Sequence, residues 1–355
     1  EKKEIYKAIE KVFLKGQFVL GEEVDKFEKN ICKFLNVKNC VALNSGTDAL
    51  VLGLHLLGVK KNHEVITPAN SFVASAAAIV HLGATPVFAD VNEDQNINPS
   101  DIEKKINKNT KAIMPVHLSG KPCEMSEIIN LSKKYAIPII EDAAQSIGTK
   151  YKNKFIGTLG EVGCFSAHPL KNLNAVGDSG YLVTNNTSLA KAAKLLRNHG
   201  IEKRNKILRF GYVSRMDNLQ AAVLNLRLKN LKKIIKKRRS NAKLYIKYLK
   251  NLKKIKIIYE NRSEFHTYHT FVVQAEKRNN LKKYLEKKGI LTAIHYPYLI
   301  FEQKAYKRRF KPINDKKFPV SIQLSKKILT LPINQYLKSK DIKKICTEIK
   351  NFYKK

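Results

Sequence analysis

Short β-branched apolar runs alternate with helix-sized segments over the first half of the chain, and this alternation limits the possible folds more than any other feature. The apolar runs are 40–43, 64–67, 85–89, 111–116 and 137–140. The segments between them are 48–58, 71–82, 99–106 and 124–135. Strands that alternate with helices predict βαβ crossovers and a mostly parallel sheet. The runs are apolar throughout, as in strands that helices cover on both faces. We therefore expect an α/β protein.

Helical spacing of apolar residues dominates the remainder of the chain. The segments with this spacing are 5–13, 24–35 and the long Lys-studded stretch 216–250. Beyond residue 255 we expect a smaller α/β unit, with strands near 267–274 and 291–296 and a closing helix over 340–353. No low-complexity linker or internal repeat interrupts the sequence. The expected organisation is a large domain of residues 1–240 and a small C-terminal domain of residues 241–355 packed on it.

The formal net charge is +37, from 67 Lys and Arg against 30 Asp and Glu. Such an excess is typical of proteins that bind nucleic acid, so a nucleic-acid-binding regulator is one hypothesis. However, 56 of these residues are Lys scattered along the chain. The sequence also lacks a helix-turn-helix pattern and the aromatic and glycine pattern of RNA-binding sheets. We interpret runs such as 229–239 as solvated helix faces and expect no nucleic acid partner.

Cysteine use and hydropathy indicate the cellular compartment. The five Cys are odd in number and form no C-x-x-C pair, so we expect neither a disulfide framework nor a metal site. No apolar run approaches the roughly 18 residues that span a bilayer, and no signal-type apolar core follows residues 1–4. We therefore expect a cytoplasmic protein with no membrane partner.

Three places just after predicted strands carry polar residues, where open parallel sheets bind ligands. The turn 44–50 leads into a helix and offers a hydroxyl and free N–H groups suited to a phosphate, although it could be a simple helix cap. Asp142 follows the strand 137–140, where a carboxylate could also cap a turn. Lys171 lies in a stretch with little charge, yet a lone Lys is most often a surface residue.

Together these three features are the parts that a pyridoxal phosphate (PLP) site requires. The Lys amine forms a Schiff base with the aldehyde, the carboxylate keeps the pyridine nitrogen protonated, and the turn holds the phosphate. An aromatic side chain on the face of the ring would complete the site.

The sequence resembles the DegT/StrS-type nucleotide-sugar aminotransferases, which have the fold-type-I PLP architecture. The resemblance covers nearly the whole chain. The motifs that carry it include NSGT (44–47), TPANSF (67–72), PVHLSG (115–120), EDAAQ (141–145), LRNHG (196–200), SRMD (214–217) and HYP (295–297). Their number and order make a chance resemblance negligible.

The resemblance implies a role for each site residue. Lys171 and Asp142 are the catalytic pair: the Schiff-base lysine and the partner of the pyridine nitrogen. The other implied cofactor contacts are Gln145 at the ring hydroxyl, Phe72 on the ring face, and Gly46, Thr47, Asp48, Ser166 and Ser214 near the phosphate. The implied substrate contacts are His168, Asn172, Arg215, His295 and Tyr296.

The residue at position 171 distinguishes two reactions within this family. Some relatives are dehydratases that carry His there, and His can move a proton but cannot form a Schiff base. Lys171 therefore favours transamination, in which an amino donor, expected to be glutamate, passes its amine through the cofactor to a nucleotide-linked keto-sugar. A PLP-dependent dehydratase or a cyclitol aminotransferase on the same scaffold remains an alternative.

Two departures from the family pattern concern the partner subunit and the substrate. Relatives usually carry Asn where this chain has Val213, and in them that Asn reaches the cofactor phosphate of the partner subunit. Ser214, Arg215 or a backbone N–H would have to compensate in the expected homodimer, whose sites are shared. After 295–297 the chain reads Leu299-Ile300-Phe301 where relatives have a different loop. The carbon that receives the amine, C3 or C4, therefore stays open.

Overall fold

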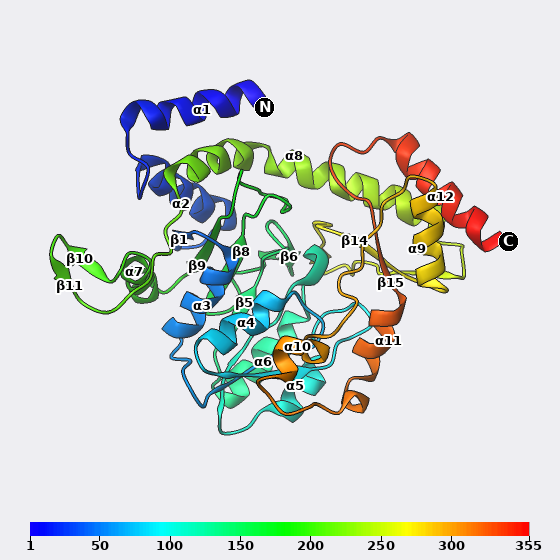
Figure 1. The fold of residues 1–355 in the computed structure, drawn as a ribbon, viewed down its shortest axis with the longest axis horizontal. Coiled ribbons are helices and arrows are strands. Elements are labelled where there is room, and N and C mark those ends of the chain that lie inside the picture. The colour runs from blue at the N-terminus through cyan, green and yellow to red at the C-terminus, as the bar shows by residue number, and fades with distance from the viewer. Residues whose placement is uncertain (355) are drawn as a thin grey trace.

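The computed structural model describes residues 1–354, and a mixed sheet lies at its centre (Figure 1). The strands β1 (Asn39–Leu43), β9 (Gly180–Thr184), β8 (Val162–Ser166) and β5 (Ile140–Asp142) are hydrogen-bonded in that order. The strands β3 (Thr85–Ala89), β2 (Glu64–Pro68) and β4 (Thr110–Ile113) form a second set. Parallel bridges join the two sets, from Ile113 to Ile139 and from Val116 to Asp142. Only β9 runs antiparallel to its neighbours among these strands, so the predicted mostly parallel sheet is confirmed.

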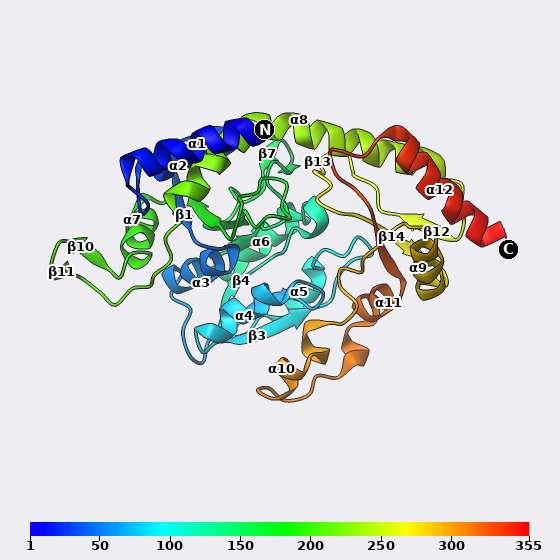
Figure 2. The ribbon, with the colours of Figure 1, turned by 45° about the horizontal axis from the view of Figure 1, so that its top comes forward.

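Helices cover both faces of this sheet (Figure 2). On one face α2 (Glu22–Leu35), α6 (Met125–Tyr135) and α8 (Asn218–Leu249) bury Phe27, Ile128 and Leu231 against the strands. On the other face lie α3 (Gly46–Leu56), α4 (Val73–His81) and α7 (Thr187–Leu196). The helix α1 (Lys2–Lys15) lies along α8, and α5 (Pro99–Lys105) packs beside β3 and α6. The apolar runs of the sequence are thus buried from both sides, which is why they do not alternate with polar residues.

The C-terminal part forms a second core around a small antiparallel sheet. Its strands are β12 (Ile255–Ile257), β14 (Phe271–Ala275) and β15 (Ile328–Leu331), and α9 (Arg278–Lys287) and α12 (Ser339–Lys354) pack against it. The helix α8 contributes Leu231 to the first core and Tyr245 to this one. It therefore runs unbroken through the predicted boundary between residues 240 and 241, and that division of the chain stays a prediction.

The prediction of a strand over 291–296 is wrong. β15 takes the place beside β14, and only Ala293 of this segment makes a bridge, to Thr330. The segment instead turns toward the large sheet, where the Tyr296 hydroxyl accepts a hydrogen bond from Gln145. The strand expected from residue 267 begins only at Phe271, because Thr267 and Thr270 donate their N–H groups to the loop at 119–120.

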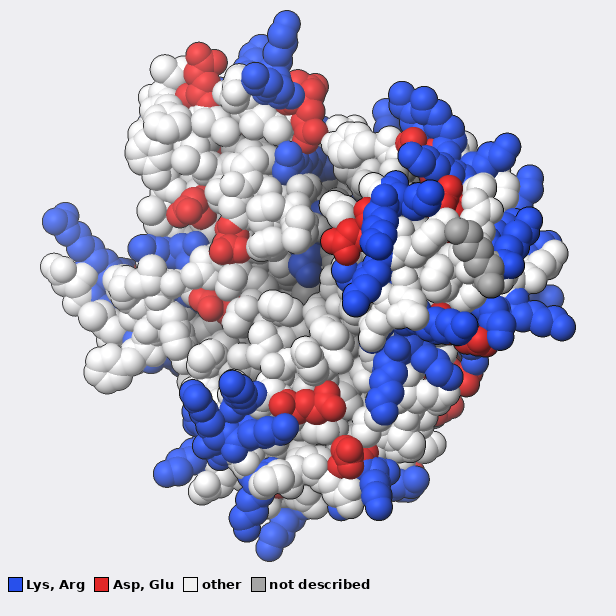
Figure 3. Space-filling model, turned by 45° about the vertical axis from the view of Figure 1, so that its right-hand side comes forward, with Lys and Arg blue, Asp and Glu red and all other residues white. Residues whose placement is uncertain are grey.

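Short elements complete the described fold. The hairpin β6 (Lys150–Tyr151) and β7 (Lys154–Phe155) pairs with β13 (Glu264–Phe265), and the hairpin β10 (Ile201–Lys203) and β11 (Lys206–Ile207) projects from the body at the left of Figure 1. The helix α11 (Pro319–Lys327) packs against β14, and α10 (Lys304–Lys307) lies beside β3, with the Tyr306 ring next to that of Phe88. Within residues 1–354 no helix combines the length and apolarity that crossing a membrane requires. Lys and Arg are spread over several parts of the face in Figure 3, with Asp and Glu among them.

Candidate active site

The residues that follow β1, β2, β5 and β8 meet around one cavity of about 420 Å³, at the carboxyl ends of these strands. Parallel strands end at the same edge of a sheet, so segments far apart in the sequence converge there. The segments before β14 and after α9 close the cavity from the side of the small sheet, through His269, Thr270, His295 and Tyr296. Ten predicted site residues line this cavity: Gly46, Thr47, Phe72, Asp142, Gln145, Ser166, His168, Lys171, His295 and Tyr296.

The turn between β1 and α3 provides the anion-binding end of the cavity. The Ser45 hydroxyl caps α3 by accepting a 3.1 Å hydrogen bond from the N–H of Asp48. The N–H groups of Gly46 and Thr47 belong to the first turn and have no partner within the helix. A Cβ at position 46 would lie 2.7 Å from Cβ of Ser166, so the close approach of this turn to β8 requires glycine. A helix N-terminus with free N–H groups suits a phosphate.

Asp142 lies at the end of β5 and is only 4% exposed. One carboxylate oxygen accepts a 2.7 Å hydrogen bond from the Ser75 hydroxyl, and the other accepts a 3.1 Å bond from the N–H of Ala144. Burial raises the pKa of Asp142, whereas these hydrogen bonds and the nearby charge of Lys171 oppose the rise. A buried carboxylate of this kind is stabilised by a cation placed beside it.

Lys171 follows β8 and extends into the same cavity. Burial lowers its pKa, and the negative charge of Asp142 offsets part of that decrease. A lower pKa leaves more of the amine neutral near physiological pH, which is the form that attacks a carbonyl carbon. Burial, together with the positive charge of Lys171, also lowers the pKa of His295, which favours its neutral form.

Gln145 and two aromatic side chains shape the rest of the cavity. The Gln145 amide accepts a 2.7 Å hydrogen bond from the N–H of Ser119 and donates a 3.3 Å bond to the Tyr296 hydroxyl. Burial raises the pKa of Tyr296 to about 12, so the phenol keeps its proton. Phe72 is 53% exposed, and its ring centroid lies 6.0 Å from that of Tyr296. Its open ring face is available to a planar ligand.

Four predicted site residues do not line this cavity. Asp48 lies in the first turn of α3, and Asn172 is buried with its amide donating a 3.4 Å hydrogen bond to the Thr267 carbonyl. Arg215 donates a hydrogen bond to the Asn198 side chain, 3.2 Å away. Ser214 is buried, with its hydroxyl 3.4 Å from the Asn44 amide oxygen. The roles predicted for these residues stay predictions.

The structure adds residues that the sequence reasoning did not single out. Ser75 reaches Asp142 from α4, and no local pattern relates the two positions. His269 lines both this cavity and an adjoining cleft of about 710 Å³, in which Lys171, Arg227 and Arg238 also lie. Its buried Nδ1 has no hydrogen-bond partner among residues 1–354. The sequence feature that could have indicated His269 as a site residue is the pair of histidines at 266 and 269, which lies beside a buried strand.

The donor set fits PLP. A helix end with free N–H groups matches the phosphate, a buried carboxylate matches the protonated ring nitrogen, and an amine with a lowered pKa matches the aldehyde. Within the described part of the chain, no three His, Cys, Asp or Glu side chains are grouped so that they could hold a metal ion.

Comparisons with known proteins extend this picture. The profile of the DegT/DnrJ/EryC1/StrS aminotransferase family matches residues 1–350. The dTDP-3-amino-3,6-dideoxy-alpha-D-galactopyranose transaminase of Aneurinibacillus thermoaerophilus is 37% identical over 352 residues, which are 99% of this chain and 95% of that protein. The UDP-2-acetamido-2-deoxy-3-oxo-D-glucuronate aminotransferase of Pseudomonas aeruginosa is 35% identical, over 99% of this chain and 96% of that protein.

A solved structure shows the same fold. The crystal structure of S. venezuelae DesV in complex with a ketimine intermediate superposes with a TM-score of 0.97 at 33% identity, covering 100% of this chain and 95% of that one. The likeness therefore extends over both sheets and the cavity between them. Because the family profile spans residues 1–350, the chain is a PLP-dependent enzyme that belongs to the DegT/DnrJ/EryC1/StrS aminotransferase family.

Proposed function

We propose that this enzyme transfers the amino group of glutamate to a keto group of a nucleotide-linked sugar, in the biosynthesis of an amino sugar. The observation that carries the proposal is that Lys171, an amine with a lowered pKa, lines the same cavity as the buried carboxylate of Asp142. The names of the relatives support the substrate class, since one is a dTDP-sugar transaminase and another a UDP-sugar aminotransferase.

Each residue of the cavity would have its own role in a transamination. PLP, when bound, supplies a reactive aldehyde and a ring that accepts electrons. Asp142, held by Ser75 and the Ala144 N–H, keeps a negative charge where the ring nitrogen needs its proton. Once the amino group of the substrate has displaced Lys171 from the cofactor, the free amine of Lys171 would act as the base that moves a proton between substrate and cofactor. Phe72 and Tyr296 lie next to each other in the lining of the cavity, where their rings would exclude water from a bound cofactor.

The names of the two relatives favour C3 of the sugar as the carbon that receives the amine. One relative is named for a 3-amino product and the other for a 3-oxo substrate. We propose that the present enzyme also aminates a 3-keto sugar. Amination of a 4-keto sugar is the alternative. The loop with Leu299, Ile300 and Phe301 is buried against Ala69 and Phe88, so its altered sequence acts through the packing around the cavity.

We further propose a cytoplasmic homodimer with shared active sites. The projecting β10–β11 hairpin and the segment after it expose apolar side chains, with Phe210 fully exposed. This segment borders the phosphate end of the cavity, because Asn44 donates a 3.4 Å hydrogen bond to the Val213 carbonyl. Neighbouring exposed apolar side chains beside a binding site are typical of a protein interface.

Incubation of the PLP-loaded enzyme with ¹⁵N-glutamate and a panel of 3-keto and 4-keto nucleotide sugars tests the activity. We expect ¹⁵N in a 3-amino nucleotide sugar by mass spectrometry, together with 2-oxoglutarate. A deoxygenated sugar without nitrogen would identify a dehydratase, and amination of a free cyclitol alone would identify a cyclitol aminotransferase.

Light scattering after gel filtration tests the proposed homodimer, and a catalytically active monomer would contradict it.

A further inference from the structure

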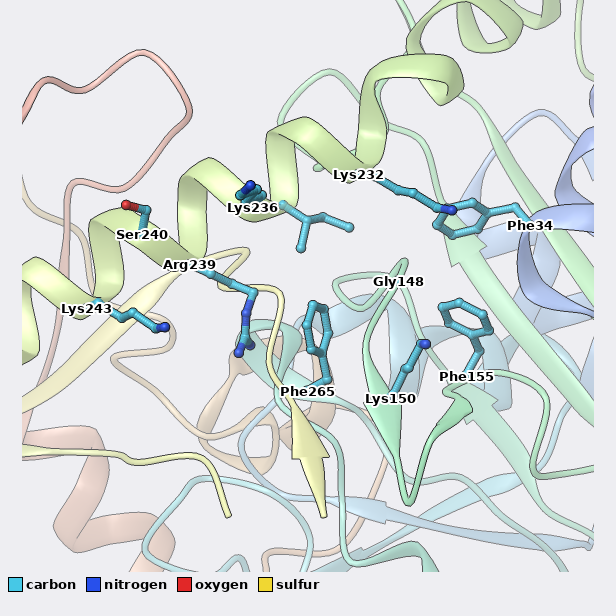
Figure 4. Close-up of a pocket in the computed structure, with 11 residues that line it drawn as sticks. Phe34, Gly148, Lys150, Phe155, Lys232, Lys236, Arg239, Ser240, Lys243 and Phe265 are labelled. Carbon is cyan, nitrogen blue, oxygen red and sulfur yellow. The ribbon is translucent and has the colours of Figure 1, made fainter. Parts of the chain in front are cut away.

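A second cavity lies on another face of α8 and shares no lining residue with the active-site cavity or the adjoining cleft. Its volume is about 490 Å³, within the range of about 300–1,000 Å³ that is usual for small-molecule sites. Adjacent residues of α8 separate the hollows: Ile234 and Arg238 line the cleft, whereas Ile235 and Arg239 line this second cavity. We call it the α8 groove (Figure 4).

One wall of the α8 groove is a basic stripe. Lys232, Lys236, Arg239 and Lys243 are three or four residues apart and so project from one helix face. Lys150 adds a cation from β6. Arg239 is paired with Glu260, but within residues 1–354 none of these four lysines has a carboxylate within 4.0 Å, and no Asp or Glu lines the groove. Unneutralised charges of one sign in a concave, largely apolar site favour an anion.

The facing wall of the α8 groove is aromatic. Phe34 comes from α2, Phe155 from β7 and Phe265 from β13, and all three rings are partly exposed. The rings of Phe34 and Phe155 have centroids 5.5 Å apart, and the Arg239 guanidinium lies 4.0 Å from the centre of the Phe265 ring. Partly exposed rings in a hollow offer stacking surface to a planar group.

The floor of the α8 groove is closed by a loop that only glycine permits. Gly148 has a φ of +83°, and a Cβ there would lie 2.6 Å from Cδ1 of Ile235. The loop therefore packs closely against α8, and Gly148 and Ile235 both line the groove. Cations also lie beside these rings, since Lys150 Nζ is 4.6 Å from the centre of the Phe155 ring, while the lysines of α8 line the opposite wall.

We propose that the α8 groove binds a nucleoside phosphate, with the base against the phenylalanine rings and the phosphates along the lysines. The stripe from Lys232 to Lys243 spans about 16 Å at 1.5 Å per residue. A chain of phosphates matches such a stripe better than a single carboxylate does. The α8 groove lies outside the active-site cavity, so a ligand bound there is independent of the proposed transamination.

Calorimetric titration of the PLP-loaded enzyme with ADP, adenosine and inorganic diphosphate at low ionic strength tests the proposal. We expect ADP to bind, and the two fragments to bind at least about tenfold more weakly, because each engages only one wall. The affinity for ADP should fall with added salt. Absence of ADP binding, or equal binding of ADP and diphosphate, would overturn the proposal.

Matched variants of α8 locate the binding. Lys236→Glu should weaken ADP binding about tenfold by reversing one charge of the stripe. Lys233→Glu makes the same change at an exposed neighbour outside the groove and should leave the affinity within about twofold. Ser240→Trp should block the groove with a bulky ring. Equal affinities in the two Glu variants would place ADP elsewhere, for example in the active site, and would refute the assignment.

Discussion

The Ser75 hydroxyl donates a 2.7 Å hydrogen bond to Oδ2 of Asp142, and Ser71 Oγ lies 2.8 Å from Ser75 Oγ. All three side chains are buried. The helix α4 therefore supports the carboxylate from a part of the chain far from it in sequence. Since burial raises the pKa of Asp142 and this bond opposes the rise, Ser75 helps keep the charge that PLP requires.

Ser75→Ala should raise the pKa of Asp142 further and weaken PLP binding about tenfold. A hydrogen bond to a charged group contributes about 1.5–3 kcal/mol, which makes a tenfold change the lower expectation. Fluorescence titration of the apoenzyme with PLP measures the affinity, and Ser75→Thr, which keeps the hydroxyl, should restore it. Unchanged affinity in the Ala variant would contradict the role of this bond.

Lys171→Ala should abolish turnover and the covalent attachment of the cofactor. Lys171→Arg should fail as well, because a guanidinium stays protonated at any accessible pH and cannot attack the aldehyde. Borohydride reduction of the PLP-loaded protein followed by peptide mass spectrometry should find the modified lysine at 171 in the unaltered enzyme only. Covalent attachment of PLP at another lysine would contradict the assignment of Lys171 as the lysine that binds the cofactor.

The rate of covalent PLP capture by the apoenzyme should rise with pH around the pKa of Lys171. Because burial lowers this pKa, the midpoint should fall below the ordinary lysine value of 10.5. The neutral amine is the reacting form, so the rate increases as the proton leaves. Stopped-flow absorbance at several pH values measures it, and a midpoint above 10.5 would contradict the burial argument.

Asp142→Asn should raise the melting temperature of the apoenzyme at pH 7 and lower the rate of transamination about 100-fold, or about 2.7 kcal/mol. Since the folded pKa is raised, the folded state binds more protons than the unfolded state between about pH 3.8 and the folded pKa. The stability of the folded state therefore falls as the pH rises through this window. The neutral amide of Asn removes the free-energy cost of burying an ionised carboxylate. Calorimetry at pH 7 and steady-state kinetics check the two effects, and a variant that is both less stable and active would refute them.

Gly46→Ala should destabilise the apoenzyme by about 1–3 kcal/mol, because its Cβ would lie 2.7 Å from Cβ of Ser166. Ser166→Gly removes that contact, so the double variant should recover part of the loss. Urea unfolding of the four proteins in this cycle measures the coupling. Additive effects would mean that the two residues do not meet.

The local sequence was sufficient to predict β1, β2, β3, β4 and β5 of the large sheet, whereas β8 and β9 were not among the predicted strands. Continuous apolar runs require burial on both faces, and the glycine and hydroxyl turn at 44–47 predicts a helix start whatever the rest of the chain does. The resemblance to the family placed Lys171, Asp142 and Gln145 in one site, and the structure brings all three into one cavity.

Tertiary structure alone decided the contacts made between segments that are distant in the chain. The segment 291–296 has apolar residues suited to a strand, yet β15 occupies that position and Tyr296 turns to Gln145 instead. Ser75 reaches Asp142, and α8 faces three phenylalanines across a groove, only because packing brings these elements together. Local propensity determines which elements form, whereas the side chains that meet depend on how the buried faces fit, and no short stretch of sequence contains that information.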